Sequence, residues 1–225
     1  MKFTEQIKTD IARLKTIEDP KEKRAFIWDY YKYPIIAVAA LLVILILAFV
    51  NNIGRGKIGL YAVLVNTDSL AVECDDSIFD KYVEQGGFSL SGKHTDVSDR
   101  YTLGSIMNEA ADVETLQVLT ALFSISDLDL YMADQTWFDY FANEGGFADL
   151  SLLIEKDLLD KVAEDLYYTE NSDGTRVLSG IVLHEGSPVH SAGFYHSDVN
   201  IGVVARAENL DAALAFVRGL LSDIN

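Results

Sequence analysis

The longest hydrophobic run lies near the start of the chain, where no charged side chain occurs between Lys32 and Arg55. Those 22 uncharged positions would span about 33 Å as a helix, and the hydrocarbon core of a bilayer is about 30 Å thick. Apolar residues face every direction of that helix, which disfavours a buried core helix. A cleaved signal peptide is also disfavoured, because 34 residues precede the apolar core, which begins at Ile35, and no small-residue cleavage motif follows it. We predict a retained transmembrane helix over residues 34–53.

The flanks of this run predict its orientation. Eight Lys and Arg residues precede it, whereas only Arg55 and Lys57 follow it closely. Basic residues favour the cytoplasmic side, so the amino terminus is expected in the cytoplasm and the remainder outside the cell. Aromatic residues suited to the headgroup region gather at the amino-terminal end of the run, at Trp28, Tyr30, Tyr31 and Tyr33. The sequence therefore predicts a single-pass plasma-membrane protein with a signal anchor.

The segment before the hydrophobic run, residues 1–33, reads as a helical cytoplasmic arm. Phe3, Ile7, Ile11 and Leu14 recur at steps of four and three, which places them on one face of a basic amphipathic helix. Two roles remain open for this helix: resting on the inner leaflet, or packing against a partner helix. A second helix is expected to begin at Asp19-Pro20, with Asp19 as the N-cap.

Strand-like and helix-like patterns alternate from residue 57 to residue 225. Apolar, β-branched runs suit buried strands, and apolar positions at helical spacing followed by glycine suit helices. Expected strands are 57–66, 96–103, 127–133 and 199–205, with a hairpin over 167–183 that turns at residues 172–174. Expected helices are 78–85, 108–125, 136–144, 155–166 and 207–221. This alternation predicts an α/β domain with a mostly parallel sheet and flanking helices, preceded by one transmembrane helix.

Charge and cysteine content narrow the partners of this domain. The 171 residues from Arg55 onward hold 10 basic and 29 acidic side chains, a balance near −19. Such a surface repels phosphate groups, so nucleic-acid binding is excluded. Cys74 is the single cysteine, so the domain has no internal disulfide. We expect Cys74 to be a small buried residue and the domain to be stabilised by its core alone.

A family resemblance follows from the order strand, helix, strand, long helix and then SISDLDLYMADQTWFDYFANEGGFADLS. This order resembles the first lobe of the extracellular solute-binding proteins of ABC importers. The tail IGVVARAENLDAALAFVRGLL is similar to that family's late strand and following helix. The resemblance implies a periplasmic-binding-protein-like single lobe. The segment FIWDYYKYPII before the anchor also looks like uncharacterised single-pass proteins of anaerobic Gram-positive bacteria.

The resemblance covers one lobe only, and this affects the expected binding site. Solute-binding proteins close two lobes around a ligand, whereas residues 154–198 suffice here for only a helix and a hairpin. A ligand would therefore bind on an open face, at the carboxyl ends of the strands. The candidate ligand-binding residues there are Asn66, Thr67, Asp134, Gln135 and Trp137.

Other chemistry was considered at two clusters. His184, His190 and His196 recur every six residues with Glu185 and Asp198 nearby, and they would hold zinc only if their loops converged. The Gly, Ser and Pro around them favour exposed loop histidines. Asp127, Asp129 and Asp134 lack the spacing of a calcium loop and are expected to be solvated.

The functional expectation is therefore modest. The chain lacks nucleophile, zinc-protease, phosphate-loop and paired-cysteine motifs. We predict no enzyme and no cofactor. The expected function is a binding or interaction role for a solute-binding-like domain, with the lipid bilayer and a membrane or envelope protein as partners. The alternative is a membrane-anchored ligand sensor or transport accessory that binds a small molecule on its open face.

Overall fold

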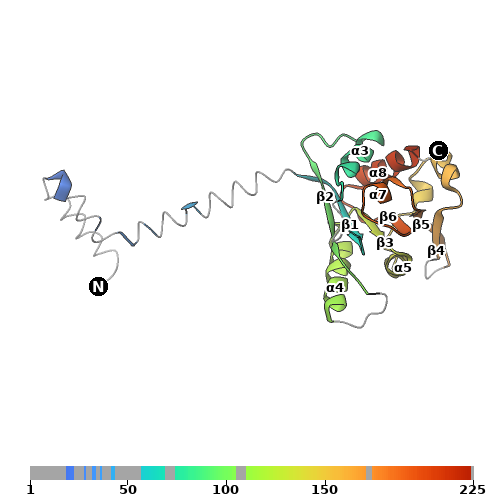
Figure 1. Cartoon of the computed structure of the whole chain (residues 1–225), viewed down its shortest axis with the longest axis horizontal. Helices are drawn as coiled ribbons and strands as arrows, with labels where there is room; N and C mark the ends of the chain where they lie inside the picture. Colours follow the sequence, from blue (N-terminus) through green and yellow to red (C-terminus); the bar gives the residue numbers. More distant parts are fainter. Residues whose placement is uncertain are drawn as a thin grey trace. The chain divides into compact units, whose positions relative to one another are not determined.

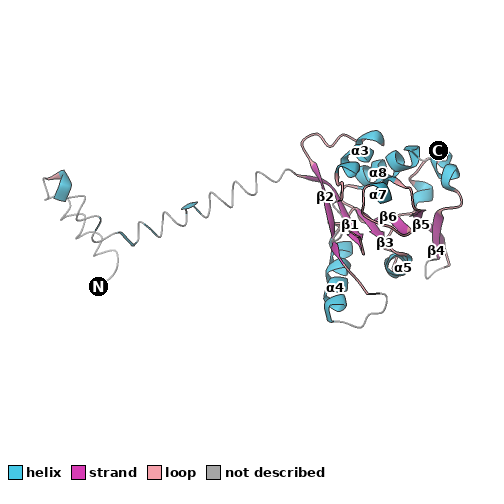
Figure 2. Ribbon diagram, viewed as in Figure 1, coloured by secondary structure: helices cyan, strands magenta, loops and turns pink. Residues whose placement is uncertain are grey.

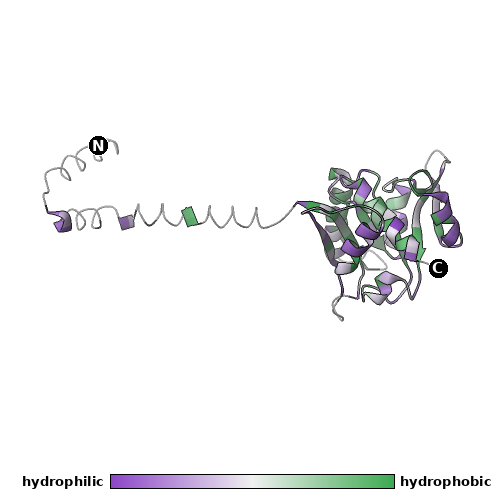
Figure 3. Cartoon of the chain, turned by 90° about the horizontal axis from the view of Figure 1, so that it is seen from above, coloured by the Kyte–Doolittle hydropathy of each residue, from purple (hydrophilic) through white to green (hydrophobic). Residues whose placement is uncertain are grey.

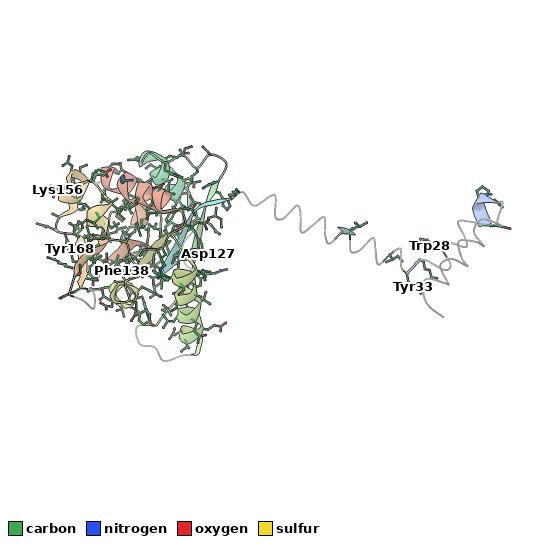
Figure 4. All side chains as sticks on the ribbon, turned by 180° about the vertical axis from the view of Figure 1, so that it is seen from behind. Trp28, Tyr33, Asp127, Phe138, Lys156 and Tyr168 are labelled. Atoms are coloured by element: carbon green, nitrogen blue, oxygen red, sulfur yellow. The ribbon has the colours of Figure 1, made fainter. Side chains whose placement is uncertain are left out.

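The protein is described by a computed structural model over residues 19–22, 28, 32–33, 36, 42–43, 57–68, 74–104, 110–170 and 174–223. It divides into two units, Met1–Arg55 and Gly56–Asn225. In the first unit, residues 20–22 are helical and the Asp19 carboxylate accepts a hydrogen bond from the Lys21 amide at 2.9 Å, which confirms the predicted helix start. Trp28 and Tyr33 are exposed (Figure 4).

The predicted transmembrane segment, residues 34–53, lies outside the described residues except at Ile36, Leu42 and Val43, which are helical. Within the described part of the chain, no helix has both the length and the apolar character needed to cross a bilayer.

A six-stranded sheet forms the centre of the second unit (Figure 1). Its spatial order is β2-β1-β3-β6-β5-β4. β1 pairs in parallel with both β2 and β3, and the pairs β3–β6, β6–β5 and β5–β4 are antiparallel. The strands are β1 (Ile58–Val65), β2 (His94–Tyr101), β3 (Leu130–Ala133), β4 (Leu166–Glu170), β5 (Arg176–Leu183) and β6 (Val199–Val203).

The sheet is therefore mixed, and the prediction of a mostly parallel sheet is wrong. Parallel neighbours need a long crossover, usually a helix, and such crossovers connect β1, β2 and β3 through α3 (Ser77–Gln85) and α4 (Ala110–Ile125). The chain between β5 and β6 carries only the four-residue helix α7 (Pro188–Ser191). That connection returns the chain beside β5 in the opposite direction.

Helices cover both faces of the sheet (Figure 2). α3 and α8 (Leu210–Asp223) pack together on one face, where they contribute Phe79, Phe216 and their neighbours to one apolar cluster. α4 and α5 (Gln135–Asn143) cover the other face and contribute Leu119 and Phe138 to a second cluster. The first face also receives side chains of the short helices η1 (Leu150–Leu152), α6 (Lys156–Leu159) and η2 (Asp160–Val162).

The alternation of side chains along the strands divides the core between these two faces. In β1, Leu60, Ala62 and Leu64 join the cluster under α3 and α8, whereas Val63 and Val65 join the cluster under α4 and α5. This is the period of two expected for a strand buried on both faces. Hydrophobic and hydrophilic positions both occur along the helices in Figure 3, as expected of helices with one buried side.

Several elements are shorter than the sequence predicts, and the differences are largest at β3 and at the helix expected over 155–166. β3 begins at Leu130 and not at residue 127. Asp129, just before it, is fully buried, and its side chain accepts hydrogen bonds from Tyr61 and Asn209. The helix expected over 155–166 is α6, one turn long, followed by the 3₁₀ turn η2. Leu166, the last residue of the expected helix, is instead the first residue of β4.

Candidate functional site

Asn66 and Asp134 come together at the carboxyl ends of β1 and β3. The Asn66 side-chain NH₂ donates to an oxygen of Asp134 at 2.7 Å, and the Leu103 backbone amide donates to the Asn66 side-chain oxygen Oδ1 at 2.8 Å. Asn66 has φ 58°, a left-handed conformation that asparagine tolerates better than most residues. The structure thus brings together two of the five candidate ligand-binding residues, at the strand ends where the sequence placed them.

Asp134 also starts helix α5. Its second oxygen accepts a hydrogen bond from the Trp137 amide at 3.2 Å, which is the N-cap arrangement favoured by aspartate. Both carboxylate oxygens are therefore engaged. The Trp137 side chain is only 5% exposed, and its indole N–H has no hydrogen-bond partner among the described residues.

Two tyrosine hydroxyls lie buried near the same edge of the sheet. The Tyr195 hydroxyl lies 3.0 Å from the Val65 carbonyl oxygen and 3.2 Å from that of Met132. It has one proton and therefore donates to one of them at a time. The Tyr131 hydroxyl is buried and has no partner within the described part of the chain. Burial raises the pKa of both tyrosines, so both hydroxyls remain protonated at neutral pH.

The other two candidate residues form different contacts. The Thr67 hydroxyl donates to the Asp99 carbonyl oxygen at 3.0 Å, which connects the end of β1 to β2. The Gln135 amide lies 3.4 Å from the Tyr167 hydroxyl on β4. Asn66, Asp134 and the Trp137 backbone thus form one hydrogen-bonded group, while Thr67 also contacts β2 and Gln135 contacts β4.

The prediction that all three aspartates are solvated is wrong for Asp129. Asp127 is exposed (Figure 4), but Asp129 is fully buried. One Asp129 oxygen accepts from the Tyr61 amide at 2.8 Å and from the Asn209 side chain at 3.1 Å, and the other accepts from the Asn209 amide at 2.8 Å. Asp129 thus joins β1, β3 and the segment before α8. Two of its three partners are backbone N–H groups, which sequence spacing does not reveal.

The histidines also separate into different environments. His184 is exposed, with its two ring nitrogens 3.1 Å from Asp165 and 3.0 Å from Asp198. The hydrogen bond to Asp198, and secondarily that to Asp165, raises the pKa of His184. His196 is exposed as well. Among the described residues, no cluster of three metal-ligating side chains occurs.

The expectation of an exposed loop histidine is wrong for His190, which is only 9% exposed. Its Nε2 lies 2.8 Å from the Ser197 carbonyl oxygen, and its Nδ1 lies 2.7 Å from the Ser187 hydroxyl. A carbonyl only accepts, so Nε2 carries a proton. The dipeptide Ser187-Pro188 was the signal for this local structure, because serine followed by proline commonly begins a helix.

Sequence reasoning missed a groove of about 710 Å³ on the α3 side of the sheet. One side is formed by Ile78, Lys81 and Tyr82 of α3 together with Asp223 of α8. The opposite side is formed by residues 182–188, Ser191 and Ala192, and Asp165 and Asp75 also line it. No residue of this groove belongs to the Asn66–Asp134 group. The groove depends on packing between distant segments, which periodicity does not predict.

Comparisons with protein-family models, with curated proteins and with solved structures found no match to this chain.

Proposed function

We propose that this chain is a single-pass plasma-membrane protein that displays its acidic α/β domain outside the cell for binding or interaction, without catalysis. The uncharged stretch between Lys32 and Arg55 supports the anchor, and the excess of basic residues before it supports a cytoplasmic amino terminus. The proposal retains the relation to solute-binding proteins, because β1, α3, β2, α4, β3 and α5 follow one another in the order on which that resemblance is based.

The observation that carries the non-catalytic role is the engagement of Asp134. A carboxylate that acts as a general acid or base must exchange a proton with a substrate. Both oxygens of Asp134 instead accept hydrogen bonds within the protein, from Asn66 and from the start of α5. The carboxylate at the strand ends therefore stabilises the fold locally, which favours a surface that binds over one that reacts.

Protease treatment of intact cells tests the membrane placement. A chain with a different epitope tag at each end is expected to lose the carboxyl-terminal tag and to keep the amino-terminal tag. Lysed cells treated in the same way provide the control, because both tags should then be lost. Survival of the carboxyl-terminal tag on intact cells, or release of the chain into the medium, would reject the proposal.

A second function, an open-face ligand sensor or transport accessory, is favoured by one observation. The Trp137 indole N–H and the Tyr131 hydroxyl are buried donors with no partner among the described residues. Buried donors normally have hydrogen-bond partners, and a ligand with hydrogen-bond acceptors would supply partners for these two groups. Binding would bring such a group to the carboxyl ends of β1 and β3.

Tryptophan fluorescence tests this second function. The chain has two tryptophans, so Trp28→Phe leaves Trp137 as the single reporter in the full-length protein. Titration with sugars or peptides, which carry hydrogen-bond acceptors, is expected to shift the emission of Trp137 and to raise the unfolding temperature. No change with any of these ligands would leave the interaction role as the better explanation.

A further inference from the structure

The groove between α3 and the β5–α7 connection is held open by close packing on its α3 side. Gly219 of α8 lies so near the Tyr82 carbonyl oxygen that an added Cβ would approach it to 2.0 Å. Gly86 at the end of α3 lies similarly against the Ala215 carbonyl, where a Cβ would approach to 1.7 Å. The Tyr82 hydroxyl also donates to Asp223 at 2.7 Å. These contacts fix α3 to α8 with little space between them, which makes this wall of the groove rigid.

The opposite wall is fixed by the buried imidazole of His190. The ring connects Ser187 at one end of the wall to the Ser197 carbonyl beyond it, at 2.7 and 2.8 Å. The two walls are also joined to each other, because the Asp75 amide just before α3 donates to the Ala192 carbonyl oxygen at 3.0 Å. The groove therefore exists before any partner binds, and binding would cost little ordering of its walls.

The charges on the groove are unbalanced. Four carboxylates line it, against one lysine and the exposed imidazole of His184. Lys81 lies over the Tyr82 ring at 4.6 Å, which places its charge against the wall. The four carboxylates are those of Asp75, Asp165, Glu185 and Asp223. Apolar surface lies between the charges and is formed by Ile78, Val182, Leu183, Pro188 and Ala192.

This charge pattern selects the occupant. A second copy of the domain carries the same balance near −19, and anionic lipid is repelled in the same way. A segment that alternates basic and apolar side chains complements both the carboxylates and the apolar floor. We propose that the groove binds a short basic and apolar segment of another exported or envelope protein. This inference rests on the interaction role proposed above, and it names the site and the chemistry of the partner.

A fluorescein-labelled peptide of alternating lysine and leucine provides the probe. The full-length chain is placed in phosphatidylcholine nanodiscs, and fluorescence anisotropy is followed as the nanodiscs are titrated into the peptide. Empty nanodiscs measure binding to lipid. Saturable binding above that background is expected for the basic peptide, and none for the matching peptide of alternating glutamate and leucine.

Charge reversal at one rim position tests the location. Glu185 lies in an exposed turn that lines the groove, and Glu185→Lys reverses its charge. Glu114→Lys is the control, because it reverses the same charge at an exposed position of α4, on the other face of the sheet. E185K is expected to weaken binding about tenfold, from the lost attraction to a nearby charge. E114K is expected to leave affinity within about twofold, because its charge is distant and screened.

Three results would overturn the groove as a peptide site. They are equal binding of the acidic peptide, equal weakening by E185K and E114K, and self-association of the chain that E185K abolishes. The last result would assign the groove to a second copy. Peptide binding does not depend on which side of the membrane the domain occupies. A failed titration with a positive protease result therefore rejects only the groove. The reverse outcome rejects the membrane placement and with it the exported source of the partner, and it leaves the groove as a site for basic and apolar segments.

Discussion

Replacing the buried carboxylate of Asp129 provides a direct test of the core. Asp129→Asn keeps the shape of the side chain but turns one of its two acceptor oxygens into an NH₂ donor. The best orientation keeps the amide oxygen where it faces the Tyr61 amide and the Asn209 side chain. The new NH₂ then faces the Asn209 backbone N–H. In the unsubstituted protein, that N–H donates to an Asp129 oxygen at 2.8 Å. One buried hydrogen bond is thus replaced by two opposed donors.

The expected loss follows from that count. A buried donor left without its acceptor costs about 1–3 kcal/mol, so D129N should lower the free energy of unfolding by about 2 kcal/mol. For a domain of this size, 1 kcal/mol corresponds to about 2–4 °C in Tm, which gives a shift of about 4–8 °C. Asp129→Ala, which removes the acceptors for all three N–H groups, should cost more than D129N.

Thermal unfolding of the full-length chain, followed by near-ultraviolet circular dichroism, measures this difference. Asp127→Asn is the matched control. It removes the same charge from a side chain that is exposed and lies two positions before Asp129. Its effect should stay within about 0.5 kcal/mol. Equal Tm values for D129N and D127N would refute the assignment of Asp129 as the buried acceptor that joins these segments.

Two further predictions concern hydroxyl and imidazole groups. Tyr195→Phe removes a donor from a buried carbonyl, that of Val65 or its neighbour on β3, and should cost about 1–2 kcal/mol in chemical denaturation. Tyr131→Phe removes a hydroxyl with no described partner and should be neutral or stabilising, so a larger loss for Y131F than for Y195F would contradict both assignments. The pKa of His184, measured by NMR, should lie above its usual value of 6.5 and fall in Asp198→Asn. Because the pKa is raised in the folded state, the stabilisation from the His184–Asp198 contact is complete below about pH 6.5 and is lost as pH rises through the raised pKa. An unchanged His184 pKa in D198N would show that the pair does not form in solution.

Local patterning predicted most elements of the fold. The apolar run over 57–66 and the helical spacing over 108–125 correspond closely to β1 and α4. The hairpin of β4 and β5 was also predicted, and residue 174 in its turn is a glycine with φ 81°. The direction of β6 in the sheet was not predicted, because the apolar run over 199–205 fits a parallel or an antiparallel neighbour equally well. Strand direction depends on the path of the preceding chain.

The position of Asn66 and Asp134 at one edge of the sheet could be predicted for a similar reason. Residues that directly follow parallel strands must lie at one edge of the sheet, which is why Asn66 and Asp134 were identified together. Asp129 accepts from the Tyr61 amide and from the amide and side chain of Asn209, and His190 contacts the Ser187 hydroxyl and the Ser197 carbonyl. Three of these five partners are backbone groups, which no residue type identifies. Sequence therefore predicts which side chains share an edge, and it does not predict which polar side chains the interior accepts.

The place of β6 in the sheet has a consequence for biogenesis. This strand is the last of the six along the chain, yet it lies between β3 and β5. Until it is available, β2-β1-β3 and β5-β4 are separate halves, each with an unpaired inner edge that is prone to aggregate. The β3–β6 pairing also joins residues about 70 positions apart, such as Leu130 and Val203, which slows closure. The sheet is therefore complete only once β6 has been synthesised, and a nascent chain halted before Val199 exposes both of these edges.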